Sequence, residues 1–542
     1  MPPPGATADH RKEAIMYDTI IIGAGSAGCV LANRLSADEN RKVLLLEAGG
    51  DQPINSKVPS DWVTLFNTDA DWGYYTTAQA GCRGRRIFWP RGKMMGGSGS
   101  MNAMIYIRGL PYDFNLWEEE MGCTGWGWDS VLPDFIACEH NANHGNSKLH
   151  GTGGPLHVES PGYRHPHEEA WVQAGVNAGY DENADFNGED QEGFGFFQFT
   201  IKEGMRSGTN RAYLIPVQDR PNLDVIKHVL VTRVLIERGR AVGVEYLRNG
   251  QPEQVRTDGE VILSAGAIGT PQIMMLSGLG PADELKAVGV EPLANIPEVG
   301  KNLQDHINVA FSYYTREHTG IGAWDDAFIA ESFKEWEESG TGPRSVPWVA
   351  AGAHVRSRPD VEPDIQLYGA ASPHRDYTRF MSVKAGMTMH CTLQRPQSRG
   401  EITLLSPDPV RYPAIDPKYF VSDPTGQDLA TLVEAIRIQR RVASSDPLAS
   451  LLDGEMSPSV ECQSDADLET YVRSHCMTLY HPSSTCRMGK DTDAVVDSDS
   501  FAVNGVDGLH VADASVFPRM ISGNLNATVI LVAERAAKAI AA

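Results

Sequence analysis

The pattern of apolar residues near the N-terminus predicts a strand, a glycine turn, a helix and a second strand. The apolar, β-branched run at 17–22 is followed by the letters GAGSAG at 23–28. A stretch with helical character, 29–36, and the apolar run 42–46 come next. Short apolar runs bounded by glycine are typical of buried strands, and two of them around a helix form a βαβ unit. We therefore expect the chain to open with such a unit.

The pattern changes several times along the rest of the chain. Residues 51–109 are rich in Gly, Pro and aromatic residues without clear periodicity, which is typical of long ordered loops around a site. Strand-like runs over 223–266 indicate a small sheet that returns to the first domain, and runs from about 306 to 420 indicate antiparallel strands of a second domain. The end of the chain, 508–542, again predicts strand, loop and helix. The two domains are therefore expected to alternate along the sequence.

The glycine turn carries the first chemical signal. Gly23, Gly25 and Gly28 have GxGxxG spacing, which permits a tight turn, close approach of the backbone to a pyrophosphate, and a helix N-terminus that points at the anion. Glu47 stands 19 residues after Gly28, where its carboxylate can accept hydrogen bonds from ribose hydroxyls and disfavours a 2′-phosphate. The pattern indicates NAD or FAD rather than NADP, with a glycine turn that binds no ligand as the plain alternative.

Charge and composition exclude several classes of protein. The 542 residues, enough for two or more structural units, include 47 Lys and Arg against 70 Asp and Glu, a net charge of −23 that disfavours a nucleic-acid partner. The eight cysteines form no CxxC pair, so we expect neither a zinc site nor a disulfide framework, and we propose no metal. No run of about 18 apolar residues occurs, and residues 1–16 lack a signal-peptide pattern. We therefore predict a cytoplasmic protein without a membrane span.

Several longer motifs resemble those of the glucose-methanol-choline (GMC) oxidoreductases. They lie at 92–115, 266–280, 299–306, 481–489 and 508–518. The resemblance covers nearly the whole chain from about residue 17. One departure is Met95, where the first motif usually has Leu, Ile or Val, and an apolar residue of similar volume changes little. The chain is identified as a member of this family, similar to its choline dehydrogenase and choline oxidase branch.

The resemblance implies an α/β fold of two domains. The first is a Rossmann-like FAD-binding domain, and the second is a substrate domain built on an antiparallel β-sheet covered by helices. The expected boundaries are 15–160, 210–305 and 470–542 for the FAD-binding domain, and 161–209 and 306–469 for the substrate domain. Some relatives attach FAD through a His where this chain has Met101. The resemblance therefore implies non-covalent FAD.

The same resemblance assigns residues to the cofactor. The glycines of 96–103 let backbone amides approach the flavin, whose reduced, anionic form is stabilised by positive dipoles. The expected FAD-binding residues are Gly23, Gly25, Ser26, Gly28, Glu47, Met95, Gly97, Asn102, Ala103, Val231, Ala265, Asp513, Ala514 and Asn526.

The resemblance also implies a catalytic pair, His481 and Asn524. Oxidation of an alcohol removes the hydroxyl proton and a hydride, and a histidine can accept that proton at neutral pH. Asn524 is expected to hold the hydroxyl oxygen with its amide while the carbon faces the flavin. Taken alone, one of 16 histidines is more often structural than catalytic, and only the motif reverses this. We expect His306, in another family motif, to be a structural residue satisfied in the core.

The substrate pocket is expected to hold Trp62, Asn308, Trp348, Leu367, Leu479 and Tyr480. The aromatic residues match those that surround the trimethylammonium group in choline oxidase, but such rings line neutral pockets equally well. Asn308 replaces the carboxylate found there, Leu367 a second His and Ala103 a Ser. A buried ammonium without a counter-charge costs several kcal/mol, so an uncharged primary alcohol is favoured over choline. Leu479 either hinders oxygen or fills space, which leaves O2 and a quinone or dye open as acceptors.

Other functions of the fold remain open at this point. Hydroxynitrile lyases keep FAD without redox use, and fatty-acid photodecarboxylases use light; both resemble this family. A non-catalytic flavoprotein is disfavoured because His481 and Asn524 are both present. The sequence does not give the natural alcohol, and it leaves self-association into a homo-oligomer open.

Overall fold

The βαβ unit predicted at the start of the chain is present. The computed structural model describes residues 16–317, 324–376, 379–380 and 385–542. The parallel neighbours β1 (Tyr17–Ile22) and β2 (Val43–Leu46) are joined through α1 (Ser26–Leu35). All of β2 is buried, and so are the last four residues of β1. Because both faces of these strands are covered, they have continuous apolar runs in place of an alternating pattern.

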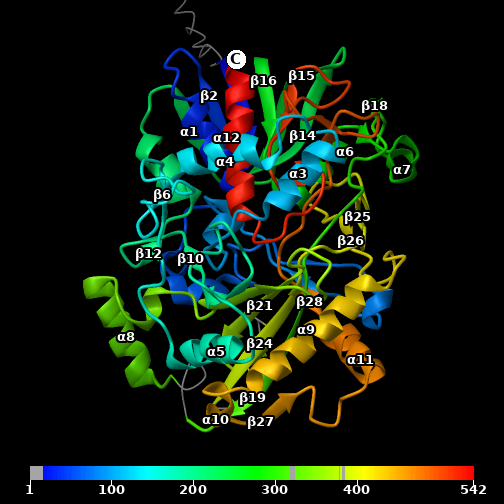
Figure 1. Cartoon of the computed structure of the whole chain (residues 1–542). Helices are drawn as coiled ribbons and strands as arrows, with labels where there is room; N and C mark the ends of the chain where they lie inside the picture. The colour runs from blue at the N-terminus through cyan, green and yellow to red at the C-terminus, as the bar shows by residue number, and fades with distance from the viewer. Residues whose placement is uncertain (1–15, 318–323, 377–378, 381–384) are drawn as a thin grey trace, which may run out of the picture.

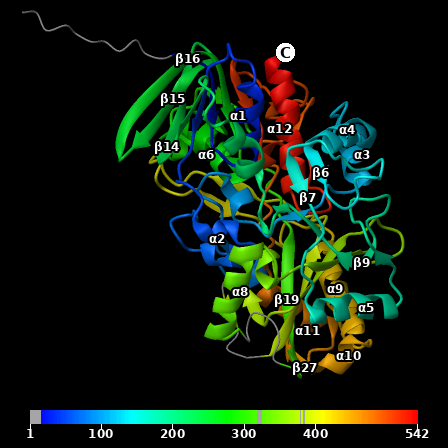
Figure 2. The ribbon, with the colours of Figure 1, turned by 90° about the vertical axis from the view of Figure 1, so that its left-hand side faces the viewer.

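The first sheet gathers strands from distant parts of the chain (Figure 1, upper half). Within the described residues it has seven strands, in the order β13–β2–β1–β16–β15–β14, with β31 beside β16. The further strands are β13 (Leu223–Ile226), β14 (Val229–Glu237), β15 (Arg240–Arg248), β16 (Gln251–Leu263) and β31 (Leu509–Val511). The last helix, α12 (Asn526–Ala541), packs on α1, as Figures 1 and 2 show. Both ends of the chain thus build one unit around the glycine turn.

The second sheet is mainly antiparallel, as predicted. Its eight strands in the described part of the chain run β27–β19–β24–β21–β20–β9–β8, with β28 beside β19. Their bounds are β8 (Glu182–Asn183), β9 (Gly193–Phe196), β19 (Ile307–Thr315), β20 (Ala351–Val355), β21 (Ile365–Ala370), β24 (Gly386–Leu393), β27 (Leu452–Ser457) and β28 (Met477–Thr478). Because β28 lies in this sheet, part of the segment 470–542 joins the second unit; the domain boundaries themselves remain a prediction.

Two helices pack directly on one face of the second sheet, and a third lies on its other side. In Figure 2, α5 (Pro166–Asn177) and α9 (Gln427–Ala443) lie on one side of it, and α8 (Asp326–Ser339) lies on the other. The helix α11 (Asp465–His475) packs on α9. The prediction of an antiparallel sheet covered by helices is confirmed, and the α/β fold class with it.

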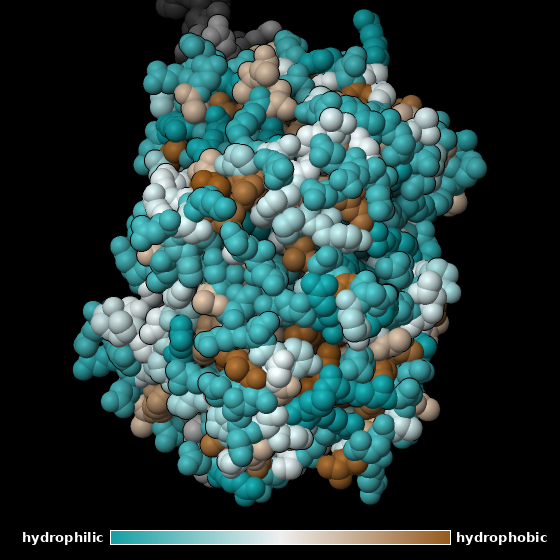
Figure 3. Space-filling view, viewed as in Figure 1, coloured by the Kyte–Doolittle hydropathy of each residue, from teal (hydrophilic) through white to brown (hydrophobic). Residues whose placement is uncertain are grey.

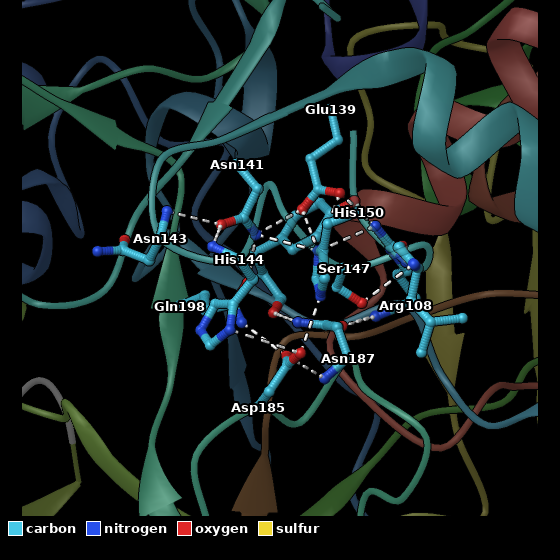
Figure 4. A network of polar contacts seen from close by, with 12 residues as sticks. Arg108, Glu139, Asn141, Asn143, His144, Ser147, His150, Asp185, Asn187 and Gln198 are labelled. Carbon is cyan, nitrogen blue, oxygen red and sulfur yellow. Dashed lines mark hydrogen bonds and ion pairs between the residues drawn. The ribbon is translucent and has the colours of Figure 1, made fainter. Parts of the chain in front are cut away.

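A buried polar network joins the short strands β6 (Glu139–Asn141) and β10 (Gln198–Phe199) to neighbouring loops (Figure 4). Its core, here called the Arg108 network, consists of Arg108, Glu139, Asn141, His150, Asp185 and Gln198. The Glu139 carboxylate binds the Arg108 guanidinium and lies 3.1 Å from His150 Nδ1, while His150 Nε2 lies 2.9 Å from Asp185. Burial opposes ionisation of Glu139, but the hydrogen bond with His150 and the charge of Arg108 outweigh it and hold the pKa of that carboxyl below its ordinary value.

The molecular surface shows no large hydrophobic patch on the face that Figure 3 draws. The face drawn in Figure 3 is mostly hydrophilic, and its hydrophobic areas are small and separate. Within the described ranges, no helix combines the length and the apolar character needed to cross a membrane.

Candidate active site

One cavity of about 490 Å³ joins the glycine turn of the first sheet to the inner face of the second. Most of the residues predicted from the sequence line it. These are Gly23, Gly25, Ser26, Glu47, Trp62, Gly97, Asn102, Ala103, Val231, Ala265, Leu479, Tyr480, His481, Asp513, Ala514, Asn524 and Asn526. The cavity therefore brings together residues as far apart in the sequence as Ser26 and Asn526, which are separated by 500 positions.

The glycine turn has the geometry that a dinucleotide needs. Gly23 has a φ of +95°, in the left-handed region. A Cβ added to Gly28 would lie 1.9 Å from the carbonyl oxygen of Gly23, so this helix residue packs directly on the turn and does not line the cavity. Glu47 accepts hydrogen bonds of 2.8 Å from the amides of Ala24 and Gly49. The turn is thus held open toward the N-terminus of α1, where anions bind.

Two further segments complete the cofactor end. Asn526 accepts a 2.6 Å hydrogen bond from the hydroxyl of Ser26, and Asp513 accepts one of 2.6 Å from Thr270 and one of 2.8 Å from the amide of Gly266. Met95 is buried outside the cavity lining, and its amide donates to the carbonyl of Gly50 at 2.9 Å. Direct contact of these side chains with FAD remains a prediction.

His481, at the other end of the cavity, is paired with His306. Their Nδ1 atoms are 2.8 Å apart. The Nε2 of His306 lies 3.0 Å and 3.1 Å from the carbonyl oxygens of Gln394 and Ile521, which can only accept. That nitrogen must therefore carry the proton of a neutral His306. Its Nδ1 then accepts a hydrogen bond, so the proton of His481 is on Nδ1 and its Nε2 has a free lone pair.

Both histidines are held neutral. Burial lowers the pKa of His306 to about 4. Burial also takes the pKa of His481 well below its ordinary value, assisted by His306 and by the positive charge of Arg91. We expected His306 to be a structural residue of the core, and it is fully buried. Its contact with His481, which fixes the tautomer of the cavity histidine, was not predicted.

Asn524 faces the unprotonated nitrogen of His481. Its Nδ2 lies 3.5 Å from His481 Nε2. Its Oδ1 accepts a 3.1 Å hydrogen bond from Gln366, whose own oxygen accepts one of 3.1 Å from Gln394. This chain of amides fixes the orientation of Asn524 with its NH2 group toward His481. A hydroxyl placed between the two can donate its proton to the histidine while its oxygen accepts from the amide.

The loop that carries His481 is held in a strained conformation. Tyr480 has a φ of +68°, in the left-handed region that a tyrosine rarely adopts. Arg91 donates to the carbonyl of Tyr480 at 2.5 Å, and the amide of His481 donates to Asp305 at 2.9 Å. Burial lowers the pKa of Arg91 to about 10, which leaves it charged at neutral pH. A fixed positive charge therefore stands beside the histidine.

Aromatic rings form the wall near His481. The rings of Trp62 and Phe66 are 5.6 Å apart, and so are those of Phe66 and Tyr480. Trp348 stacks on Trp62 at 5.6 Å and lies outside the cavity lining. Phe66 lines the cavity although it was not predicted to do so. Trp348 was predicted to line it, and it packs against Trp62 outside the lining.

Two other expected pocket residues also lie outside the lining. Asn308 is fully buried within the second sheet, where it contacts His390 at 3.0 Å and accepts from Thr392 at 3.1 Å. Leu367 of β21 is buried among core residues, whereas its neighbour Tyr368 lines the cavity. Side chains alternate between the faces of a strand, so a one-residue difference in register exchanges the two. Leu367 was expected in the substrate pocket, and the structure places Tyr368 there instead.

Tyr368 contributes an unused polar group to the cavity. Its hydroxyl is buried close to the side chain of Asn524, but it makes no hydrogen bond of ordinary geometry within the described residues. Among the described lining residues, the carboxylates are Glu47 and Asp513, and both lie at the glycine-turn end. The end that holds His481 thus presents neutral donors and acceptors, aromatic rings and the cation of Arg91.

A dinucleotide turn and a neutral histidine at two ends of one cavity are the features of an enzyme that binds a dinucleotide beside its catalytic groups. The sequence profile of the GMC oxidoreductases matches residues 17–308 and 396–533. The chain is 42% identical over 547 residues to the alcohol dehydrogenase [acceptor] of Pseudomonas putida, covering 97% of this chain and 96% of that protein. It is 39% identical over 534 residues to the mitochondrial choline dehydrogenase of Mus musculus, covering 96% and 89%.

Solved structures of two oxidases are similar to nearly the whole chain. Pyridoxine 4-oxidase from Mesorbium loti has a TM-score of 0.87 at 31% identity, with 96% of this chain and 98% of that chain covered. A variant of the formate oxidase of Aspergillus oryzae has a TM-score of 0.89 at 26% identity, with 97% and 98% covered. The chain belongs to the GMC oxidoreductase family. It is an FAD-dependent oxidoreductase that acts on CH–OH donors.

Proposed function

We propose that this enzyme oxidises an uncharged primary alcohol to the aldehyde, with His481 as the base and Asn524 as the group that holds the oxygen. The observation that carries the proposal is the bonding of His306 to two carbonyl oxygens, because it leaves Nε2 of His481 unprotonated and facing the cavity. His481 takes the hydroxyl proton at this nitrogen. The amide of Asn524 and the charge of Arg91 stabilise the negative charge that develops on the oxygen.

The cofactor fits the other end of the cavity. The open glycine turn, the N-terminus of α1 and Glu47 are suited to the diphosphate and ribose of FAD. Bound FAD supplies the ring that accepts the hydride. Trp62, Phe66 and Tyr480 exclude water from the alcohol carbon. Met101 lines the cavity and offers no nucleophile for covalent attachment, which supports non-covalent binding.

The preference for a neutral alcohol is supported by the charges around His481. A substrate ammonium there would meet the cation of Arg91, and the described lining offers no carboxylate at that end. This argument replaces the one from Asn308, which does not reach the cavity. Choline remains the second candidate because several relatives are named choline dehydrogenases. We further propose a cytoplasmic location, which the eight free thiols support.

A matched pair of alcohols tests the proposal. Holoenzyme is mixed without oxygen with choline or with its carbon isostere, in which a tert-butyl group replaces the trimethylammonium, and the bleaching of the flavin absorbance is followed. We expect the neutral alcohol to bleach the flavin at least about tenfold faster, because choline buries an unpaired charge. Faster bleaching by choline would overturn the substrate assignment. Absence of bleaching by every alcohol of a wider panel would favour lyase or light-driven chemistry.

The same experiment addresses the acceptor. Readmission of air to the bleached enzyme reoxidises the flavin within seconds if O2 is the acceptor. Reoxidation only by an added quinone or dye identifies a dehydrogenase. The Pseudomonas putida relative is named for an acceptor other than a nicotinamide, and one choline dehydrogenase relative is named oxygen-dependent, so both outcomes have precedent among the matches.

A further inference from the structure

Two cysteines that are 394 residues apart in the sequence meet in the core. The sulfur atoms of Cys82 and Cys476 are 3.3 Å apart, and both residues are fully buried. Cys82 ends the short 3-10 helix η2 (Ala80–Cys82). Cys476 follows α11 and precedes β28. All eight cysteines of the chain lie in the described ranges and are free.

Arginine side chains hold the two sulfurs in place. Arg85 donates to the sulfur of Cys476 at 3.1 Å and to its carbonyl oxygen at 2.6 Å, and it also reaches the carbonyl of Cys82 at 3.3 Å. Arg473 of α11 donates to the carbonyl of Gly81 at 3.1 Å. Arg85 thus bonds to both cysteines, and Arg473 bonds to the residue before Cys82.

This arrangement distinguishes the roles of the two thiols. The nucleophile in cysteine oxidation is the thiolate, which a nearby cation stabilises. Burial opposes ionisation of Cys476, but its hydrogen bond with Cys82 and the charge of Arg85 outweigh it and lower the pKa of Cys476. The hydrogen bond with Cys476 is the chief cause of the raised pKa of Cys82. Because the guanidinium of Arg85 lies 3.1 Å from the sulfur of Cys476, Cys476 is the attacking sulfur and Cys82 the resolving one.

We propose that Cys82 and Cys476 form an oxidisable dithiol site that a hydroperoxide closes to a disulfide and a thiol reductant reopens. The Cys476 thiolate breaks the O–O bond of hydrogen peroxide, keeps one oxygen as a sulfenic acid and releases hydroxide. Cys82 then displaces the oxygen from Cys476 as water and forms the S–S bond. In total, two thiols lose two electrons and two protons, and one peroxide becomes two waters.

The geometry requires little movement. A disulfide has an S–S length of about 2.05 Å, so the sulfurs must approach each other by about 1.2 Å from their present separation. The bond would join the loop around Cys82 to the segment that runs through β28 to His481, five residues after Cys476. The site is separate from the cavity, because neither cysteine lines it.

Peptide mapping of the oxidised holoenzyme tests the proposal. Reduced enzyme is freed of reductant, treated with hydrogen peroxide, quenched, denatured with a thiol-blocking reagent and digested without reduction. We expect the loss of two of the eight thiols and one cross-linked peptide pair joining Cys82 to Cys476, both reversed by dithiothreitol. Retention of both thiols, or oxidation distributed over the other cysteines, overturns the proposal.

Variants assign the two roles. In Cys82→Ser, Cys476 should stop at the sulfenic acid, which dimedone traps, and no cross-link should form. Arg85→Gln should slow the loss of thiols about tenfold or more, because the cation that favours the thiolate is removed. Cys123→Ser is the control, since its buried sulfur faces carbonyl oxygens of Met121 and Met488, and it should keep the cross-link. A cross-link that persists in Cys82→Ser contradicts the assigned pair.

Discussion

Two buried polar clusters of this enzyme differ in how completely their polar groups are paired. In the Arg108 network, every charge has an opposite partner: Glu139 meets Arg108 and His150, and His150 meets Asp185. Around His481, the cavity presents the cation of Arg91 and neutral polar groups that are incompletely paired. The amide of Asn524 lies 3.5 Å from His481, and the hydroxyl of Tyr368, close to Asn524, makes no hydrogen bond of ordinary geometry among the described residues.

The difference indicates what each cluster does. A buried ionic network in which every group is paired holds its segments in one arrangement and has no free hydrogen-bonding capacity for a ligand. Buried polar groups that lack partners lower the stability of the fold, and they are retained where a substrate supplies the missing hydrogen bonds. The first cluster is therefore expected to affect stability and the second to affect catalysis. The following substitutions test that division.

Replacement of His481 by Ala removes the base and should have the largest effect. We expect kcat for an alcohol to fall about 10²–10⁴-fold, the usual contribution of general base catalysis, with FAD still bound because the glycine turn is untouched. Single-turnover bleaching of the flavin measures the chemical step, and the visible spectrum of the purified variant checks the cofactor. An unchanged bleaching rate would remove His481 from the mechanism.

Replacement of Glu139 by Gln should break the other cluster. It leaves the buried guanidinium of Arg108 without its counter-charge, and we expect the free energy of unfolding to fall by about 3–5 kcal/mol while kcat stays within about twofold. Urea titration measures the first quantity. Glu189→Gln is the matched control, because the pair of Glu189 with Lys148 is 83% exposed on both sides and should contribute less than about 1 kcal/mol.

The acid limb of stability adds a second measurement for Glu139. Because the native network holds the pKa of this carboxyl below its ordinary value, its stabilisation is fully present above the unfolded carboxyl pKa and is lost as the pH falls. The wild-type enzyme should therefore lose stability more steeply than Glu139→Gln between about pH 5 and pH 3. Parallel pH curves for the two proteins would contradict the role of the network.

The sequence could predict those parts of the site that local pattern encodes. The GxGxxG turn could be predicted because its glycines are required by local structure. Gly23 has a left-handed φ, and Gly28 packs closely on the turn. The Arg108 network could not be predicted, because its members come from two short strands and several loops that are far apart in the sequence. The pairing of His306 with His481 joins residues 175 apart. Leu367 was predicted to line the pocket, but its neighbour Tyr368 does so, because one position along a strand decides which face a side chain takes.

Substitutions of His306 test whether it acts through His481. In His306→Ala, Nδ1 of His481 loses its acceptor and the tautomer is no longer fixed, so we expect kcat to fall about 10–100-fold with KM little changed. In His306→Gln, the amide oxygen can accept from Nδ1, and part of the rate should return. Equal activity of the two variants would indicate that His306 only fills space.

Tyr368→Phe should have the smallest effect and the most informative sign. Removal of one hydrogen bond to the substrate should lower kcat/KM about 2–10-fold. Removal of a buried hydroxyl that lacks a partner in the free enzyme should raise the free energy of unfolding, by up to about 1 kcal/mol. Kinetics with a neutral alcohol and urea titration measure the two quantities on the same preparation. A lower kcat/KM together with a higher free energy of unfolding would show that the hydroxyl of Tyr368 gains its hydrogen bond from the substrate, as the comparison of the two clusters requires. A loss of both activity and stability would place it with the Arg108 network, as a side chain that the fold itself satisfies.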